Sequence, residues 1–163
     1  MTKLLLSIHV IAAIVAVGSI TVAASMFPRY ALQALDGTEG QGRSAGVAAL
    51  LHRVCYGYSL AGVFVPVFGI ATGAALGVLT DAWLIASLVL TLIAAAILGL
   101  AILPGQRRLL TEGEGEGEGG DPPTLEAARP MAARLTMLTG IFNLVWAVVV
   151  VLMIVRPGST TGA

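Results

Sequence analysis

Four long apolar runs alternate with short polar stretches along the 163-residue chain. The runs cover residues 4–27, 54–80, 83–103 and 135–155, and each is close to the roughly 20 residues that a helix needs to cross a bilayer. None of them contains Asp, Glu, Lys or Arg. The pattern therefore predicts an all-α polytopic membrane protein, a single domain built as a four-helix transmembrane bundle.

The second run carries an unusual face of small residues. Its members recur every three or four positions, which places them on one side of a helix: His52, Cys55, Ser59, Gly62, Pro66, Gly69, Gly73 and Gly77. In lipid, such a groove lets a neighbouring backbone approach closely. We expect this groove helix to be central in the bundle, to contact the first helix through Gly62, Gly69 and Gly73, and to kink near Pro66.

The boundaries of the runs are marked by Pro, Gly and basic residues. We expect the first helix to end at residues 26–30, a polar loop to follow to residue 42, and Ser44 to cap the second helix. Pro104 and Gly105 should end the third helix. The alternating Gly and Glu of residues 112–123 predict a mobile linker, after which Thr124 caps a short interfacial helix.

Composition agrees with a membrane location. The chain is 57% hydrophobic and only 11% charged, whereas roughly a quarter of the residues of soluble domains are charged. Seven of the nine basic residues flank the first and third connections, which places these connections inside and both termini outside (N-out, C-out): Arg29, Arg43, Arg53, Arg107, Arg108, Arg129 and Arg134. The Ala, Gly, Val and Arg bias is typical of a high-GC bacterium, so we expect the bacterial cytoplasmic (plasma) membrane. A net charge of zero gives no indication of nucleic acid as a partner.

Two histidines are the first candidates for chemistry, because ligating residues within a membrane mark functional sites. His9 shares a face of the first helix with Ala12, Ala16 and Ser19, which should pack against a neighbour. His9 is either a haem or copper ligand or a donor to a nearby carbonyl or hydroxyl. His52 lies at the opposite surface by the expected topology, so we do not expect one haem to bridge the two histidines within a monomer.

Other polar positions have structural interpretations. Asn143 should hydrogen-bond between helices, and Cys55 should be buried packing. Trp83 and Tyr30 are expected as anchors in the interfacial belt. No phosphate-binding loop, HExxH or GxSxG motif occurs, so an enzyme is not indicated.

These features favour a non-catalytic subunit or assembly factor of a larger bacterial membrane complex, such as a respiratory complex. Its partners are then the lipid bilayer and other membrane subunits or a second copy, with no cofactor. The alternative is a haem- or copper-binding redox or metal-handling protein that uses His9, with the metal itself left open. A small-molecule carrier ranks third, because no polar pocket can be read from the sequence.

The first helix also resembles known families at residues 6–13, LSIHVIAA, followed by Gly18 and Ser19. It is similar to small bacterial predicted integral membrane proteins of unknown function, which have about four spans, and more weakly to the copper-resistance membrane component family. The resemblance implies a four-span bundle. Ala16 stands where the families usually have an aromatic residue, and Ser19 where they have a second glycine, so a metal role for His9 is not carried over.

Overall fold

The computed structural model describes residues 2–36, 40–113 and 124–158, and in these ranges the chain forms helices and no strand. The first span is α1 (Thr2–Leu35), and the second consists of α2 (Gln41–Gly62) and α3 (Phe64–Leu76). The third consists of α4 (Ala82–Ala96), the π-helix η1 (Ile97–Ile102) and α5 (Leu103–Gly113). The fourth is α6 (Leu125–Val155). All four are long and apolar enough to cross a membrane, which confirms the expected four-helix transmembrane architecture.

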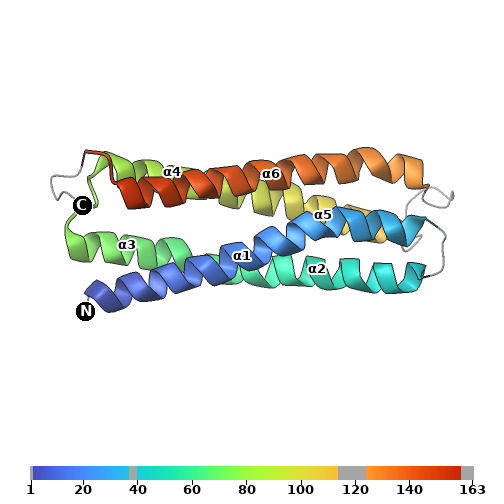
Figure 1. Ribbon diagram of the computed structural model, residues 1–163, viewed down its shortest axis with the longest axis horizontal. Helices are drawn as coiled ribbons and strands as arrows, with labels where there is room; N and C mark the ends of the chain where they lie inside the picture. Colours follow the sequence, from blue (N-terminus) through green and yellow to red (C-terminus); the bar gives the residue numbers. More distant parts are fainter. Residues whose placement is uncertain (1, 37–39, 114–123, 159–163) are drawn as a thin grey trace.

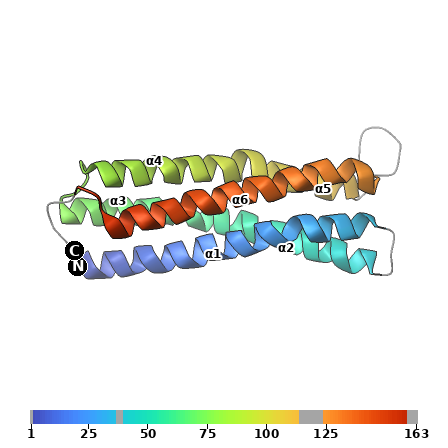
Figure 2. The ribbon, with the colours of Figure 1, turned by 45° about the horizontal axis from the view of Figure 1, so that its top comes forward.

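The spans run antiparallel side by side (Figures 1 and 2). At one end of the bundle, here called the terminal end, α1 begins, α6 ends and α3 is linked to α4. At the other, the connection end, α1 is followed by α2 and α5 by α6. Among the described residues, the first span packs against all three others, because α1 contacts α2, α3, α5 and α6. The groove helix was expected in this central place, so that expectation was wrong.

The helices extend well beyond the apolar runs at the connection end. The expected end of the first helix at residues 26–30 is wrong, because α1 passes through Pro28 and reaches Leu35. The expected loop to residue 42 is correspondingly shorter. A second buried cluster explains the extension, since apolar side chains of α1, α2, α5 and α6 meet there: Phe27, Ala31, Ala48, Leu109, Ala128, Ala132 and Leu135. Tyr30 packs against this cluster and is half-buried.

The third span also continues where an end was expected. Pro104 and Gly105 lie inside α5, and the turn before them is the π-helix η1. A proline removes one backbone donor and crowds the preceding turn, and a wider π-type turn accommodates this without ending the helix. Gly105 has a packing role instead, because a Cβ placed there would lie 2.8 Å from Leu135 Cδ2 of α6.

The second span is interrupted at Val63, between α2 and α3. Pro66 has no N–H to donate to Gly62, four residues earlier, and the Val63 N–H turns to the Leu60 carbonyl at 3.2 Å. The break thus lies one turn before Pro66, near the expected kink. Ser44 does not cap α2 as expected, since the helix begins earlier, after Gly40 in a left-handed conformation (φ 103°).

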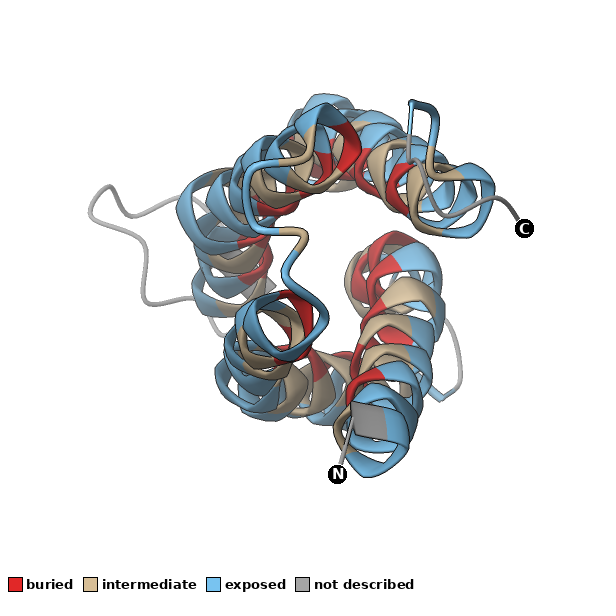
Figure 3. Cartoon of the chain, turned by 90° about the vertical axis from the view of Figure 1, so that its left-hand side faces the viewer, coloured by how far each residue is buried: buried red, intermediate tan, exposed pale blue. Residues whose placement is uncertain are grey.

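The middle of the bundle is a close-packed core. Residues from all four spans meet in it: Ile20, Ala23, Ala24, Cys55, Ala94, Leu98, Ile102 and Phe142. Figure 3 shows the buried positions turned toward the bundle axis and the exposed ones turned outward on every helix. Since many exposed side chains are large and apolar, the outer surface suits a lipid environment.

The fourth span includes the expected interfacial segment. Thr124 caps α6, with its side chain accepting from the Ala127 N–H at 3.3 Å, which confirms the predicted cap. The helix then runs without interruption to Val155, so the interfacial segment and the span form one helix. The expected Gly/Glu linker falls outside the described residues, apart from residues 112 and 113, which belong to α5.

Candidate functional site

A cavity of about 430 Å³ lies in the half of the bundle toward the terminal end. Its wall is formed by α1, α3, α4 and α6 and is mostly aliphatic. A second hollow of about 360 Å³ shares seven wall residues with it and continues toward the terminal end. The two buried clusters fill the middle and the connection end, so the terminal half is the part of the bundle that holds this space.

His9 is the most polar residue that lines both hollows. It is 7% exposed, and its Nδ1 lies 2.9 Å from the Val65 carbonyl oxygen. Because a carbonyl only accepts, Nδ1 carries the proton and donates it. In the neutral imidazole Nε2 then keeps its lone pair. The break in the second span positions this acceptor, since Val65 lies in the first turn of α3, directly after Val63.

Gly69 determines how closely the imidazole approaches α3. A Cβ at Gly69 would lie 3.0 Å from His9 Cε1 and 3.4 Å from Nδ1, which is tighter than ordinary contact. The absence of a side chain at Gly69 therefore leaves the room that the ring occupies. Of the three expected contacts between the groove and the first helix, this one is present.

The other small residues of the groove do not make the expected contacts with α1. A Cβ at Gly73 would meet Leu84 Cδ2 of α4 at 2.9 Å, and one at Gly62 would meet nothing within 4 Å, so neither glycine provides the expected contact with α1. Gly77 ends α3 in a left-handed conformation (φ 70°) and is a C-cap, which corrects its assignment to helix packing. Ser59 donates to the Tyr56 carbonyl of its own helix at 2.7 Å. Pro66 lines the cavity.

Few other polar groups face the cavity. The Thr91 hydroxyl also lines it but donates to the Ser87 carbonyl at 2.8 Å. Trp146 lines it as well, and its Nε1–H, although buried, has no hydrogen-bond partner among the described residues. The cavity thus combines the lone pair of one histidine nitrogen with an apolar wall.

The terminal end of the second hollow is lined by a cation and an aromatic ring. Arg156 places its guanidinium carbon 5.4 Å from the centre of the Trp83 ring, and Trp83 Nε1 donates to the Asp81 carboxylate at 3.0 Å. Both Trp83 and Arg156 line the hollow. Trp83 is buried against other helices, so the expected anchor in the interfacial belt was wrong for this residue.

The remaining predicted residues lie on helix contacts. Asn143 Oδ1 accepts from the Thr21 hydroxyl of α1 at 2.9 Å, which joins α6 to α1. Ala16 is buried, while Ala12 and Ser19 are half-buried on the same side of α1. Cys55 is fully buried in the core cluster.

Sequence reasoning missed a polar chain between the second and third spans. His52 Nδ1 lies 3.0 Å from Gln106 Oε1, and Gln106 Nε2 donates toward Cys55 Sγ at 3.6 Å. Gln106 is only 1% exposed. A glutamine directly after an expected helix end offered no signal of burial. This chain does not border the cavity, so His9 and His52 belong to separate places in the fold, as expected.

Some residues of the cavity wall are of the kinds that hold a haem. His9 and Met153 line both hollows and are nitrogen and sulfur donors of the kind that bind haem iron, and Arg156 suits a propionate. A histidine that ligates a metal usually donates its other ring N–H to a carbonyl or carboxylate, as His9 does. The described residues contain no group of three or more His, Cys, Asp or Glu that could hold a metal ion.

Comparisons of the chain with protein-family models, with curated proteins and with solved structures gave no match.

Proposed function

We propose that this chain is a membrane protein that holds a haem in the cavity of its terminal half, with His9 as the iron ligand. The observation that carries the proposal is the hydrogen bond from His9 Nδ1 to the Val65 carbonyl, which leaves Nε2 as the available donor atom in an apolar cavity. Bound haem would supply one-electron redox chemistry.

Size and lining support this choice over a polar substrate. Pockets for small molecules and cofactors usually measure about 300 to 1,000 Å³, are mostly apolar and carry a few placed polar groups. The cavity of about 430 Å³ meets each criterion. A copper ion would use little of this space and would call for further nitrogen or sulfur donors.

An absorption spectrum and metal analysis of the purified protein test the proposal. We expect a Soret band and about one iron per chain when the producing cells are supplied with a haem precursor. Copper without a Soret band would favour the metal-handling alternative. A co-purifying lipophilic molecule without metal would favour a small-molecule carrier, and both results would contradict the haem proposal.

A second function, as an accessory subunit or assembly factor of a larger membrane complex, is favoured by the open side of the groove. A Cβ at Gly62 would meet nothing within 4 Å, and Gly62 lies at the break between α2 and α3, so its small surface is free to receive a helix of another protein. If so, Gly62→Leu should abolish stoichiometric co-purification of a partner from native membranes while the chain itself stays folded. An unchanged set of partners would argue against this function.

We further propose that the terminal end faces outward and the connection end faces the bacterial cytoplasm, from the distribution of basic residues. Thr80 lies at the terminal end, in the link between α3 and α4, and Asp36 lies at the connection end, directly after α1. Cysteines introduced at these positions in intact cells should react differently with a membrane-impermeant maleimide. Labelling is expected for Thr80→Cys and not for Asp36→Cys, and the reverse pattern would overturn the orientation.

A further inference from the structure

A cleft of about 490 Å³ runs between α1 and α6 near the connection end, away from the cavity of His9. The residues that line it are Ser25, Pro28, Arg29, Leu32, Gln33, Arg129, Ala132, Ala133 and Thr136. Two arginines, one from each helix, therefore face the same space. No acidic residue of the described ranges is among its lining residues.

The position of the cleft matches the boundary between hydrocarbon and head groups. Ser25 belongs to the first apolar run, and Arg29 follows shortly after that run ends. On α6 the order is reversed, since Arg129 precedes the fourth apolar run and Thr136 lies within it. Both helices thus present arginine on one side of this boundary and a hydroxyl on the other.

Small residues make the space between the two helices. Ala132 and Ala133 line α6 where it faces the cleft, and Ala132 is buried against α1 and α5 neighbours in the second cluster. Thr136 donates to the Ala132 carbonyl at 3.0 Å and so covers one of its own helix's carbonyl groups. The other polar groups of the lining are the two guanidinium groups, the Gln33 amide and the Ser25 hydroxyl.

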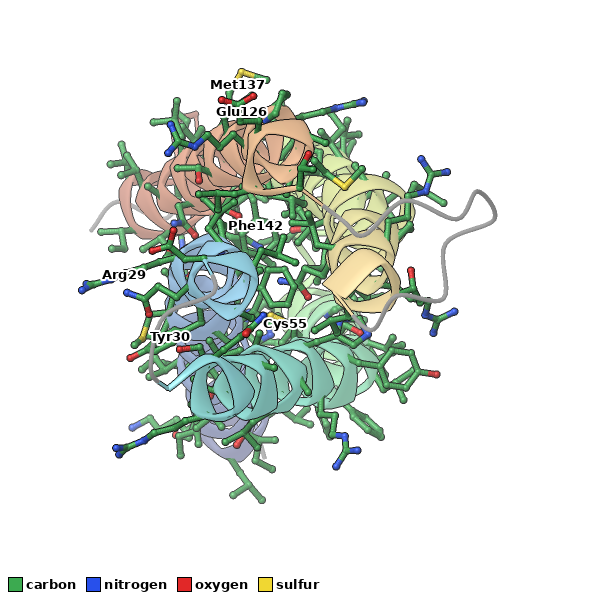
Figure 4. All side chains as sticks on the ribbon, turned by 90° about the vertical axis from the view of Figure 1, so that its right-hand side faces the viewer. Arg29, Tyr30, Cys55, Glu126, Met137 and Phe142 are labelled. Atoms are coloured by element: carbon green, nitrogen blue, oxygen red, sulfur yellow. The ribbon has the colours of Figure 1, made fainter. Side chains whose placement is uncertain are left out.

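The two arginines remain available to a ligand. Both are exposed, and Figure 4 shows Arg29 directed away from the bundle on α1. Glu126, which lies one turn before Arg129 on α6, is drawn on the outer side of that helix, far from Arg29. Guanidinium groups form paired hydrogen bonds with phosphate oxygens, and basic pockets between transmembrane helices suit acidic lipid head groups.

We propose that this cleft binds the head group of an anionic phospholipid, with Arg29 and Arg129 contacting its phosphate and Leu32 and the alanines of α6 bordering the start of its acyl chains. The apolar runs on either side make lipid the natural occupant, because a lipid supplies the phosphate and the hydrocarbon at matching depths.

Native mass spectrometry of the full chain in detergent, titrated with phosphatidylglycerol or phosphatidylcholine, tests the proposal. We expect phosphatidylglycerol to bind more tightly, and the double variant Arg29→Gln, Arg129→Gln to weaken its binding by roughly 10-fold or more. Glycerol phosphate alone should not compete at equal concentration, because it lacks the acyl chains. Competition by glycerol phosphate would mean a site for free phosphate and would overturn the lipid assignment.

The matched control is the double variant Arg107→Gln, Arg108→Gln, which removes the same charge from α5 without touching the cleft. It should leave phosphatidylglycerol binding within roughly twofold of the unmodified protein. Equal loss in both double variants would mean general electrostatic attraction, and no preference for phosphatidylglycerol in the unmodified protein would also contradict the site. Circular dichroism verifies that each variant keeps its helices.

Discussion

Replacing His9 with alanine is expected to remove the Soret band of the purified protein and to weaken haem binding more than about 100-fold. Loss of a residue that only orients a metal ligand typically costs 10- to 100-fold in affinity, so loss of the ligand itself should cost more. The truncation also removes the donor to the Val65 carbonyl, which is buried. Absorption spectra of the variant and of the unmodified protein, recorded at equal concentration with added haem, measure the change.

His52→Ala is the matched control for this prediction. His52 also hydrogen-bonds through Nδ1, but it is half-buried, its partner is Gln106 and it does not line the cavity. We expect its Soret band to equal that of the unmodified protein. Equal losses in both variants would mean that the histidines affect folding, whereas a full Soret band in His9→Ala would exclude His9 as the ligand.

Gly69→Leu is expected to destabilise the bundle by about 1 to 3 kcal/mol, the usual cost of inserting extra carbon atoms into a packed interior. The first added atom, Cβ, already lies 3.0 Å from the His9 ring, and the rest of the side chain would push His9 or α3 away from α1. The same change should weaken haem binding, because it disturbs the hydrogen bond to Val65. Equilibrium unfolding in mixed detergent micelles measures the stability.

Gly62→Leu provides the comparison on the same span. Both glycines were expected to contact the first helix, but a Cβ at Gly62 meets nothing within 4 Å. We expect its free energy of unfolding to stay within about 0.5 kcal/mol of the unmodified protein, as for a surface substitution. Similar destabilisation at both positions would show that glycine matters for the helix itself and not for the contact with His9.

The four spans could be predicted because their signal is local. Each apolar run is long enough to cross a bilayer and contains no charged residue, and both properties can be read from that run alone. The helix ends were predicted less well. Judged from the neighbouring sequence alone, Pro28 and Pro104 should end their helices, yet both lie inside helices. Packing against other spans at the connection end outweighs the missing backbone hydrogen bond.

The site could be predicted only in part, because it depends on contacts between distant segments. The sequence indicated His9 as a candidate and offered a carbonyl as one partner, but nothing local identifies Val65, 56 positions away, as that carbonyl. The small-residue face could be recognised from the spacing of its residues, but spacing does not show which neighbouring helix each residue contacts. Gly69 meets α1, Gly73 meets α4 and Gly77 ends its helix. The cavity itself is space between four spans, which no single segment encodes.

The most direct measurement of the central claim is a haem titration of the protein purified without haem, followed by absorption in the Soret region. The account predicts a saturable band that levels off at about one haem per chain, since one histidine lines the cavity. It also predicts quenching of tryptophan fluorescence with the same end point, because Trp146 lies in the cavity wall. A band that rises without saturation, or a titration that leaves both signals unchanged, would contradict the assignment of this cavity to haem.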